Sequence, residues 1–162
     1  MNENICYGMR NMVALVRLRV KIIMKKMSIA DILKGVGLKR TTGREALLNV
    51  LMDAPFPLTQ DEISLRLTDV GLNRVTIYRA LDSFLEAGLV HRIESGERVW
   101  KFAYCGCGSR EHCHPHFICR ACGKVECLED IALPEIRNIK HGYCIEGEEL
   151  YLRGLCAACS LR

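Results

Sequence analysis

The first half of the chain carries apolar residues at helical spacing in short blocks, each with its own start signal. Ser28 is the expected N-cap of the first block, and Thr59 with Glu62 three residues later forms the capping-box pattern of a later one. Asn73 is the expected N-cap of the last block, which keeps one face apolar. Helices are therefore predicted over residues 28–36, 42–52, 59–70 and 74–87.

A two-residue alternation of apolar and polar positions replaces the helical pattern after Gly88. Two such runs, residues 89–93 and 98–102, flank a turn that contains Gly96 and predict a β-hairpin. Helices followed by a hairpin are the element order of a winged helix-turn-helix domain. We place this domain at residues 28–103.

A stretch rich in Cys, Gly and His, residues 104–115, follows the hairpin and is predicted to be a hinge and a metal-binding linker. The patterns beyond it favour a second domain of strands and helix at residues 116–162, so the expected fold class is α/β, of the α+β type. Residues 1–27 fit neither domain, and we interpret them as a disordered extension or the product of an over-long start-codon choice. In the second domain strands are predicted over residues 117–119, 124–126 and 143–153, and a helix over residues 133–140.

Charge and cysteine content narrow the class of protein. The net charge is +4, and residues 1–103 hold 16 Lys and Arg against 11 Asp and Glu, a mild basic bias that by itself says little about nucleic acid. Nine of the ten cysteines lie between Cys105 and Cys159. The apolar stretch at residues 12–16 is too short for a signal peptide or a membrane span. We therefore expect a cytoplasmic protein, without a membrane partner, whose thiols are mostly reduced.

Two CxxC motifs give the strongest chemical signal in the sequence. Cys119 and Cys122 form the first, and Cys156 and Cys159 form the second. Four thiolates suit a tetrahedral zinc ion, and the two-residue spacing lets both sulfurs of one motif reach the same ion. The sequence therefore predicts a structural zinc site that ties the start of the second domain to the end of the chain.

A second cluster of metal-binding residue types surrounds the hinge. Three histidines fall within five residues, and His114 and His116 alternate, so on a strand they face the same side. Imidazole together with thiolate suits zinc better than iron, which commonly has carboxylate ligands. The predicted regulatory metal site draws on His91, Cys105, His112, His114, His116 and Cys127, while Cys107, Cys113 and Cys144 stay open as ligands or bystanders.

These residues resemble the ferric uptake regulator family of bacterial metal-responsive repressors. The resemblance runs from about Ala30 to Cys159. Its pieces are Gly37-Leu-Lys39-Arg-Thr41, Arg44, Val75-Thr-Ile-Tyr78-Arg79-Ala-Leu81, Glu86-Ala-Gly88-Leu-Val90, His114-Pro-His116-Phe-Ile-Cys119, Cys122-Gly-Lys124-Val125 and Gly154-Leu-Cys156-Ala-Ala-Cys159.

The resemblance implies a homodimer that binds a palindromic DNA operator when it is loaded with metal, with the second domain as the dimerisation domain. It also implies that the helix predicted at residues 74–87 enters the major groove, which agrees with the polar face at its N-terminal end. The expected DNA contacts are Lys39, Arg40, Asn73, Arg74, Thr76, Tyr78 and Arg79.

Departures from the family pattern bear on the sensed metal. Where iron-sensing members usually have a His and a carboxylate, this chain has Pro57 and Lys101. The resemblance is greater to the zinc uptake regulator branch, in which His91 and His112 match ligand positions and Cys127 stands in place of a Glu. We therefore expect the regulatory site to prefer Zn²⁺ over Fe²⁺.

Other functions stay open at this point. An iron- or peroxide-responsive regulator of the same family is the first alternative, and haem binding is another, since Cys and His both ligate haem iron. From other classes, the CxxC pairs could belong to a thiol-disulfide enzyme, although no βαβ unit accompanies them. A zinc-held protein-interaction module would leave the polar face of residues 73–79 without a role. We expect a regulator and not an enzyme.

Overall fold

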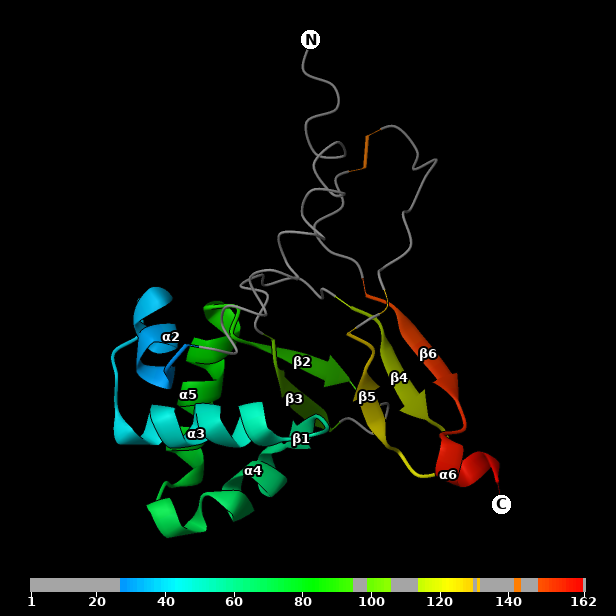
Figure 1. Ribbon diagram of the computed structural model, residues 1–162, viewed down its shortest axis with the longest axis horizontal. Coiled ribbons are helices and arrows are strands. Elements are labelled where there is room, and N and C mark those ends of the chain that lie inside the picture. The colour runs from blue at the N-terminus through cyan, green and yellow to red at the C-terminus, as the bar shows by residue number, and fades with distance from the viewer. Residues whose placement is uncertain are drawn as a thin grey trace.

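The computed structural model of the chain describes residues 27–94, 99–105, 114–129, 131, 142–143 and 149–161. The predictions for residues 1–26 and for a helix at residues 133–140 lie outside this part of the chain. Figure 1 shows the helices of the N-terminal part on one side, one three-stranded sheet next to them, and a second three-stranded sheet on the far side.

The predicted helix starts are confirmed at all three N-caps. The side chains of Ser28, Thr59 and Asn73 each accept a hydrogen bond from a backbone N–H three residues later. The capping box is complete, because the carboxylate of Glu62 also accepts from the Thr59 N–H at 2.7 Å. The helices are α2 (Ile29–Gly35), α3 (Thr42–Asp53), α4 (Gln60–Arg66) and α5 (Arg74–Glu86), with a 3-10 turn, η1 (Thr68–Val70).

The helix predicted over residues 59–70 is wrong at its end. Helix α4 stops at Arg66, and the chain continues as η1 to Gly71, which has φ +69°. The hydroxyl of Thr68 donates to the Leu65 carbonyl at 2.8 Å. A side chain that bonds to nearby carbonyls in this way competes with the regular helix ladder, which explains the early end.

The first sheet contains the predicted hairpin and one strand that the sequence did not predict. Strands β2 (Val90–Glu94) and β3 (Trp100–Tyr104) are antiparallel, and β1 (Leu58–Thr59) pairs antiparallel with the other edge of β3. Strand β3 lies two residues later than predicted. Strand β1 has only two residues and directly follows Pro57, so it leaves no alternation to detect.

The second sheet has the order β5-β4-β6. Strand β4 (His116–Cys119) is antiparallel to β5 (Val125–Cys127) and parallel to β6 (Tyr151–Gly154). The strand predicted over residues 143–153 is wrong at Tyr143, which follows a turn at Gly142, and at residues 149–150. A short helix, α6 (Ala157–Ser160), was not predicted and holds the last CxxC motif at its start.

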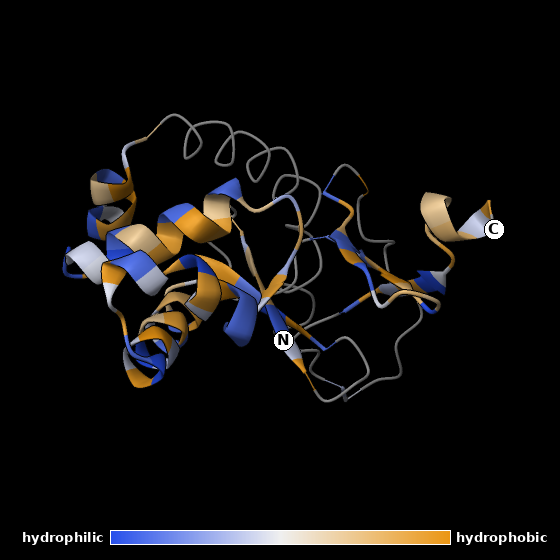
Figure 2. Cartoon of the chain, turned by 90° about the horizontal axis from the view of Figure 1, so that it is seen from below, coloured by the Kyte–Doolittle hydropathy of each residue, from blue (hydrophilic) through white to orange (hydrophobic). Residues whose placement is uncertain are grey.

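Two apolar cores hold these elements together. Figure 2 shows hydrophobic residues, in orange, interspersed with hydrophilic ones, in blue, along the helices. The larger one joins helices α2 to α5 to the first sheet, and Leu33, Ile63 and Phe84 in it are fully buried. The smaller one lies between the sheets, where Ile93 and Ala103 of the first sheet meet Ile118 and Val125 of the second. None of the helices in the described ranges is both long and apolar enough to cross a membrane.

Candidate metal centres and DNA-binding helix

The four cysteines of the two CxxC motifs come together at the end of the second sheet. Cys119 ends β4 and Cys122 lies in the turn after it, while Cys156 precedes α6 and Cys159 lies within it. All four sulfurs lie within 4.8 Å of one another. The Sγ atoms of Cys122 and Cys156 are 3.8 Å apart. A zinc–sulfur bond of about 2.3 Å gives a tetrahedron with edges of about 3.8 Å, so this group fits zinc.

Backbone groups prepare this site for thiolates. The N–H of Cys156 donates to the Cys119 sulfur at 3.3 Å. This bond, followed by that from the Cys122 N–H, lowers the pKa of Cys119 to about 6. Hydrogen bonds with the thiols of Cys156 and Cys122 raise the pKa of Cys159 to about 12. A divalent cation between the sulfurs reverses this second effect, because it favours every thiolate.

A second group of donor atoms lies where the two sheets meet. His91 comes from β2, His114 precedes β4, His116 begins β4, and Cys127 ends β5 directly opposite His116. One donor atom from each of these side chains lies within 4.8 Å of the others. The three imidazoles are buried, with exposed fractions of 6%, 1% and 0%. Cys127 is half-buried.

The geometry of this group also suits a tetrahedral ion. The Cys127 Sγ and His91 Nε2 atoms are 3.6 Å apart, and a tetrahedral zinc site has a sulfur–nitrogen edge of about 3.6 Å. The His116 and His91 Nε2 atoms are 2.9 Å apart, somewhat closer than the edge of about 3.3 Å between two zinc-bound nitrogens. Among the described residues no carboxylate belongs to this group. We call it the mixed site.

Not every predicted ligand joins the mixed site. Cys105 is buried at the end of β3, where its N–H donates to the Leu89 carbonyl, but its thiol is not part of the group. His112 lies outside the described residues, as do Cys107, Cys113 and Cys144. The sequence placed Cys105 and Cys127 on equal terms. The pairing of β4 with β5 distinguishes the two candidate ligands, because it sets Cys127 beside His116.

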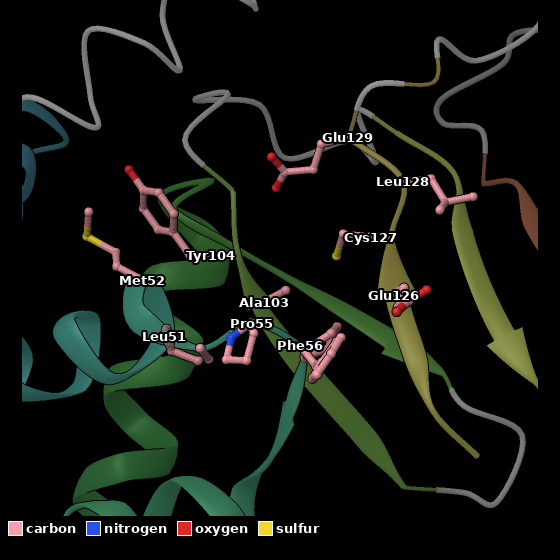
Figure 3. A pocket seen from close by; sticks show the side chains of 12 residues that line it. Leu51, Met52, Pro55, Phe56, Ala103, Tyr104, Glu126, Cys127, Leu128 and Glu129 are labelled. Atoms are coloured by element: carbon pink, nitrogen blue, oxygen red, sulfur yellow. The ribbon is translucent and has the colours of Figure 1, made fainter. Parts of the chain in front are cut away.

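Cys127 also faces a cavity of about 390 Å³ between the two parts of the chain. Figure 3 shows Cys127 on β5 together with Tyr104 from the end of β3 and Phe56 from the loop after α3. Glu129 lines the same cavity. Within the described residues, Cys127 is therefore the donor of the mixed site that lines this opening, while the three imidazoles lie deeper.

The polar face of α5 is exposed, as expected for a DNA-binding helix. The side chains of Thr76, Tyr78 and Arg79 project to solvent, and Tyr78 is 53% exposed, so it is not a core aromatic. Asn73 caps the helix, and Arg74 forms an exposed ion pair with Asp61 at 2.6 Å. Both residues already have protein partners that DNA contact would replace or share.

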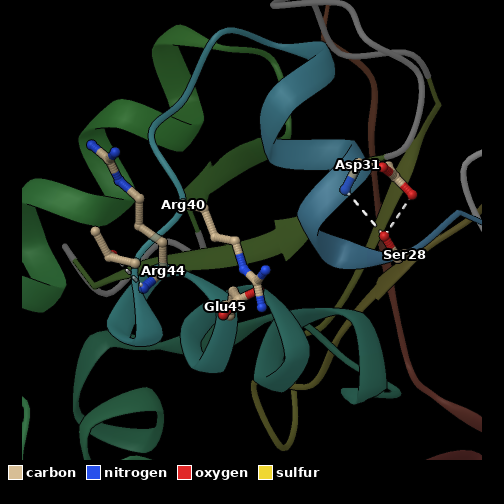
Figure 4. A network of polar contacts seen from close by, with 6 residues as sticks. Ser28, Asp31, Arg40, Arg44 and Glu45 are labelled. Atoms are coloured by element: carbon tan, nitrogen blue, oxygen red, sulfur yellow. Dashed lines mark hydrogen bonds and ion pairs between the residues drawn. The ribbon is translucent and has the colours of Figure 1, made fainter.

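The loop before α3 carries the remaining predicted DNA contacts. Lys39 and Arg40 are exposed, and Arg40 turns toward Glu45 on α3, with which it forms an ion pair at 2.5 Å (Figure 4). Arg44 donates to the Lys39 carbonyl at 2.9 Å and reaches Ser83 on α5 at 3.4 Å. The loop is thus tied to α3, and Arg44 in turn links α3 to α5, which keeps the loop's cations near the start of α3.

Comparison with known proteins decides the family. The model of the Ferric uptake regulator family matches residues 35–152, well over half of the chain. The chain belongs to the ferric uptake regulator family. Ferric uptake regulation protein of Escherichia coli (strain K12) is 36% identical to it over 133 residues, which cover 77% of this chain and 86% of that protein. As a family member the chain is a metal-responsive transcriptional regulator and not an enzyme, which excludes the thiol-disulfide alternative.

Solved structures of family members share the fold. The ferric uptake regulator of Vibrio cholerae is 28% identical with a TM-score of 0.56, covering 78% of this chain and 98% of that one. A zinc uptake regulator in complex with zinc and DNA is 25% identical with a TM-score of 0.60, covering 90% of this chain and 95% of that one. The α+β fold class is therefore confirmed, with a four-cysteine cluster in its C-terminal part.

Proposed function

We propose that this ferric uptake regulator family member is a zinc-responsive, DNA-binding transcriptional repressor that controls genes of metal uptake or homeostasis in the cytoplasm. The observation that carries the proposal is the mixed site, which offers three imidazoles and one thiolate and, among the described residues, no carboxylate. Nitrogen and sulfur donors favour zinc, whereas the oxygen-rich sets typical of iron sensors include carboxylates.

The origin of the four donors supports a sensing role. His91 belongs to the first sheet, and His114, His116 and Cys127 belong to the second. An ion bound by all four donors stabilises the arrangement in which the two sheets are docked. It favours this docked state because, in any other arrangement of the sheets, the ion loses at least one of its four donors. Docking fixes the direction in which α5 projects, so metal occupancy is coupled to DNA binding.

The four-cysteine site has a different proposed role. Its four donors, Cys119, Cys122, Cys156 and Cys159, fill the coordination of a zinc ion, so the ion has no open position for a changing ligand. All of them belong to the proposed C-terminal domain at residues 116–162, where a bound ion holds β4 to the end of the chain. We assign this zinc to folding and not to sensing.

DNA recognition is assigned to α5 and the loop before α3. Arg79 and Thr76 face the major groove, Tyr78 contacts the backbone or a base edge, and Lys39 and Arg40 bind phosphates. Asn73 and Arg74 complete the helix N-terminus that approaches the DNA. The proposed partner is a palindromic operator, bound by a homodimer that forms through residues 116–162. The zinc uptake regulator solved with zinc and DNA supports DNA as the partner.

A double variant tests the proposal. Replacing His114 and His116 with Ala removes two donors of the mixed site and leaves the four cysteines in place. We expect zinc-dependent operator binding to be lost while the dimer and one tightly bound zinc per monomer remain. The readouts are gel-shift titration with zinc, size-exclusion chromatography and metal analysis. Retained zinc-dependent operator binding would contradict the assignment, and a response to Fe²⁺ alone in the unmodified protein would place it among the iron sensors.

A further inference from the structure

The turn that holds the first CxxC motif also touches the DNA-binding part of the chain at two places. The Nζ atom of Lys101, near the start of β3, donates to the Gly123 carbonyl at 3.3 Å in a partly buried contact. The next residue, Lys124, places its ammonium 4.0 Å from the centre of the Phe56 ring. We call these two contacts the knuckle clasp. Both join residues that are far apart in sequence and lie on opposite sides of the gap between the sheets.

The shape of the clasp depends on the cysteine turn. The Cys119 N–H donates to the Lys124 carbonyl and the Gly123 N–H donates to the Cys119 carbonyl, each at 2.9 Å. Gly123 has φ +68°, a left-handed conformation that suits glycine and aims its carbonyl out of the turn. The same turn that brings the first two sulfurs together therefore sets the position of both clasp partners.

The clasp lies near the start of β3 and of β5, and the mixed site lies nearer their other ends. On the first sheet, Lys101 pairs with Ile93, whereas His91 pairs with Ala103 two residues further along β3. On the second sheet, β5 begins next to Lys124 and ends at Cys127. The small apolar core of Ile93, Ala103, Ile118 and Val125 fills the space between them. The clasp thus fixes one end of the interface whose other end carries the metal donors.

The charges around the clasp favour its persistence. Lys124 also forms an ion pair with Glu126 at 2.5 Å, which holds the ammonium over the ring. The Phe56 side chain is 42% exposed, and the Lys124 ammonium lies over the face of its ring. Neither clasp contact requires an ion in the mixed site, because the partners are a lysine with a carbonyl and a lysine with an aromatic ring.

We propose that the knuckle clasp is a positioning device that holds His91 opposite His114, His116 and Cys127 before zinc arrives. Through the clasp, the four-cysteine metal sets the zinc affinity of the mixed site as well as stabilising the fold. The inference rests on the proposed zinc-sensing function. A site whose donors are already aligned binds more tightly, because less of the binding energy is spent on shifting the protein into the competent state.

The test is a zinc titration of variants against a chromophoric chelator, on protein that retains its tightly bound zinc. Lys101→Met removes the ammonium and keeps the aliphatic stem, and we expect the second zinc to bind about 3- to 10-fold more weakly. Phe56→Leu, which leaves the cysteine turn untouched, should weaken it about 2- to 5-fold. Lys101→Arg keeps a donor and should restore most of the affinity. Lys34→Met, an equal charge loss at an exposed residue of α2, is the matched control.

Small-angle X-ray scattering provides a readout that does not depend on zinc sensing. Without added zinc, Lys101→Met should have a larger radius of gyration than Lys34→Met, because its sheets separate more often. If the unmodified protein binds a second zinc and both clasp variants bind it as Lys34→Met does, with equal radii, the clasp is wrong and the proposed function stands. If the unmodified protein binds no second zinc, the zinc assignment fails, and the scattering comparison still decides whether the clasp exists.

Discussion

Replacing Cys127 with serine removes one of the four donors of the mixed site while leaving the backbone pairing with His116 intact. Zinc sites with four protein ligands contribute about 10–16 kcal/mol, so an even share for one ligand is about 3 kcal/mol, or roughly a hundredfold in affinity. The Cys127 sulfur lies 3.6 Å from the His91 nitrogen, which is the edge length of a zinc tetrahedron. We therefore expect Cys127→Ser to lose the full binding free energy of one ligand.

The assay is competition for zinc with a chelator of known affinity, on protein that keeps one tightly bound zinc. Cobalt substitution adds a second observable, because the thiolate-to-cobalt charge-transfer band should disappear in Cys127→Ser. Cys105→Ser is the matched control, since Cys105 is also a cysteine of the chain's second half. Its thiol is buried and does not belong to the mixed site. Unchanged affinity in Cys127→Ser would refute the four-donor assignment, and a large loss in Cys105→Ser would assign the thiolate ligand to Cys105 instead.

Three further outcomes follow from the structure. Cys122→Ser should lose the zinc that survives mild chelation and should unfold the C-terminal part, as followed by metal analysis and circular dichroism, whereas retention of that zinc would argue against the four-sulfur site. Arg79→Ala should weaken operator binding by about 1–3 kcal/mol in a fluorescence anisotropy titration without changing zinc affinity. The hydrogen bond from the Thr59 N–H lowers the pKa of Glu62, so Glu62→Gln should destabilise the protein at neutral pH. In denaturant titrations this difference should begin to shrink as the pH falls below about 4.5, where the unfolded chain takes up the proton, and should vanish once the pH is below the lowered pKa of the folded state. A difference independent of pH would count against the capping box.

Local signals in the sequence predicted the helix starts well. Ser28, Thr59 and Asn73 act within three residues of themselves, so the neighbouring residues are enough to identify them. The two CxxC motifs are similarly local signals. The fold was needed only to show that the two motifs lie close together in space. The end of α4 was missed because the competing bond from the Thr68 hydroxyl is weak beside the apolar pattern that continues to Val70.

Contacts between distant segments could not be predicted in this way. Cys105 and Cys127 were equivalent candidates in the sequence, and the register of β4 against β5 places only Cys127 beside His116. Lys101 was noticed only because it replaces a carboxylate expected from the family pattern, and its contact with Gly123 depends on how the two sheets pack. Strand β1 is stabilised by pairing with β3 and not by any pattern of its own.

The most direct test of the central claim is the metal content per monomer before and after mild EDTA, combined with operator binding when zinc or Fe²⁺ is added back. We predict that one zinc per monomer survives EDTA in the four-cysteine site and that zinc alone restores operator binding through the mixed site. Restoration by Fe²⁺ alone would contradict the zinc-sensing account, while leaving the fold and the four-cysteine site in place.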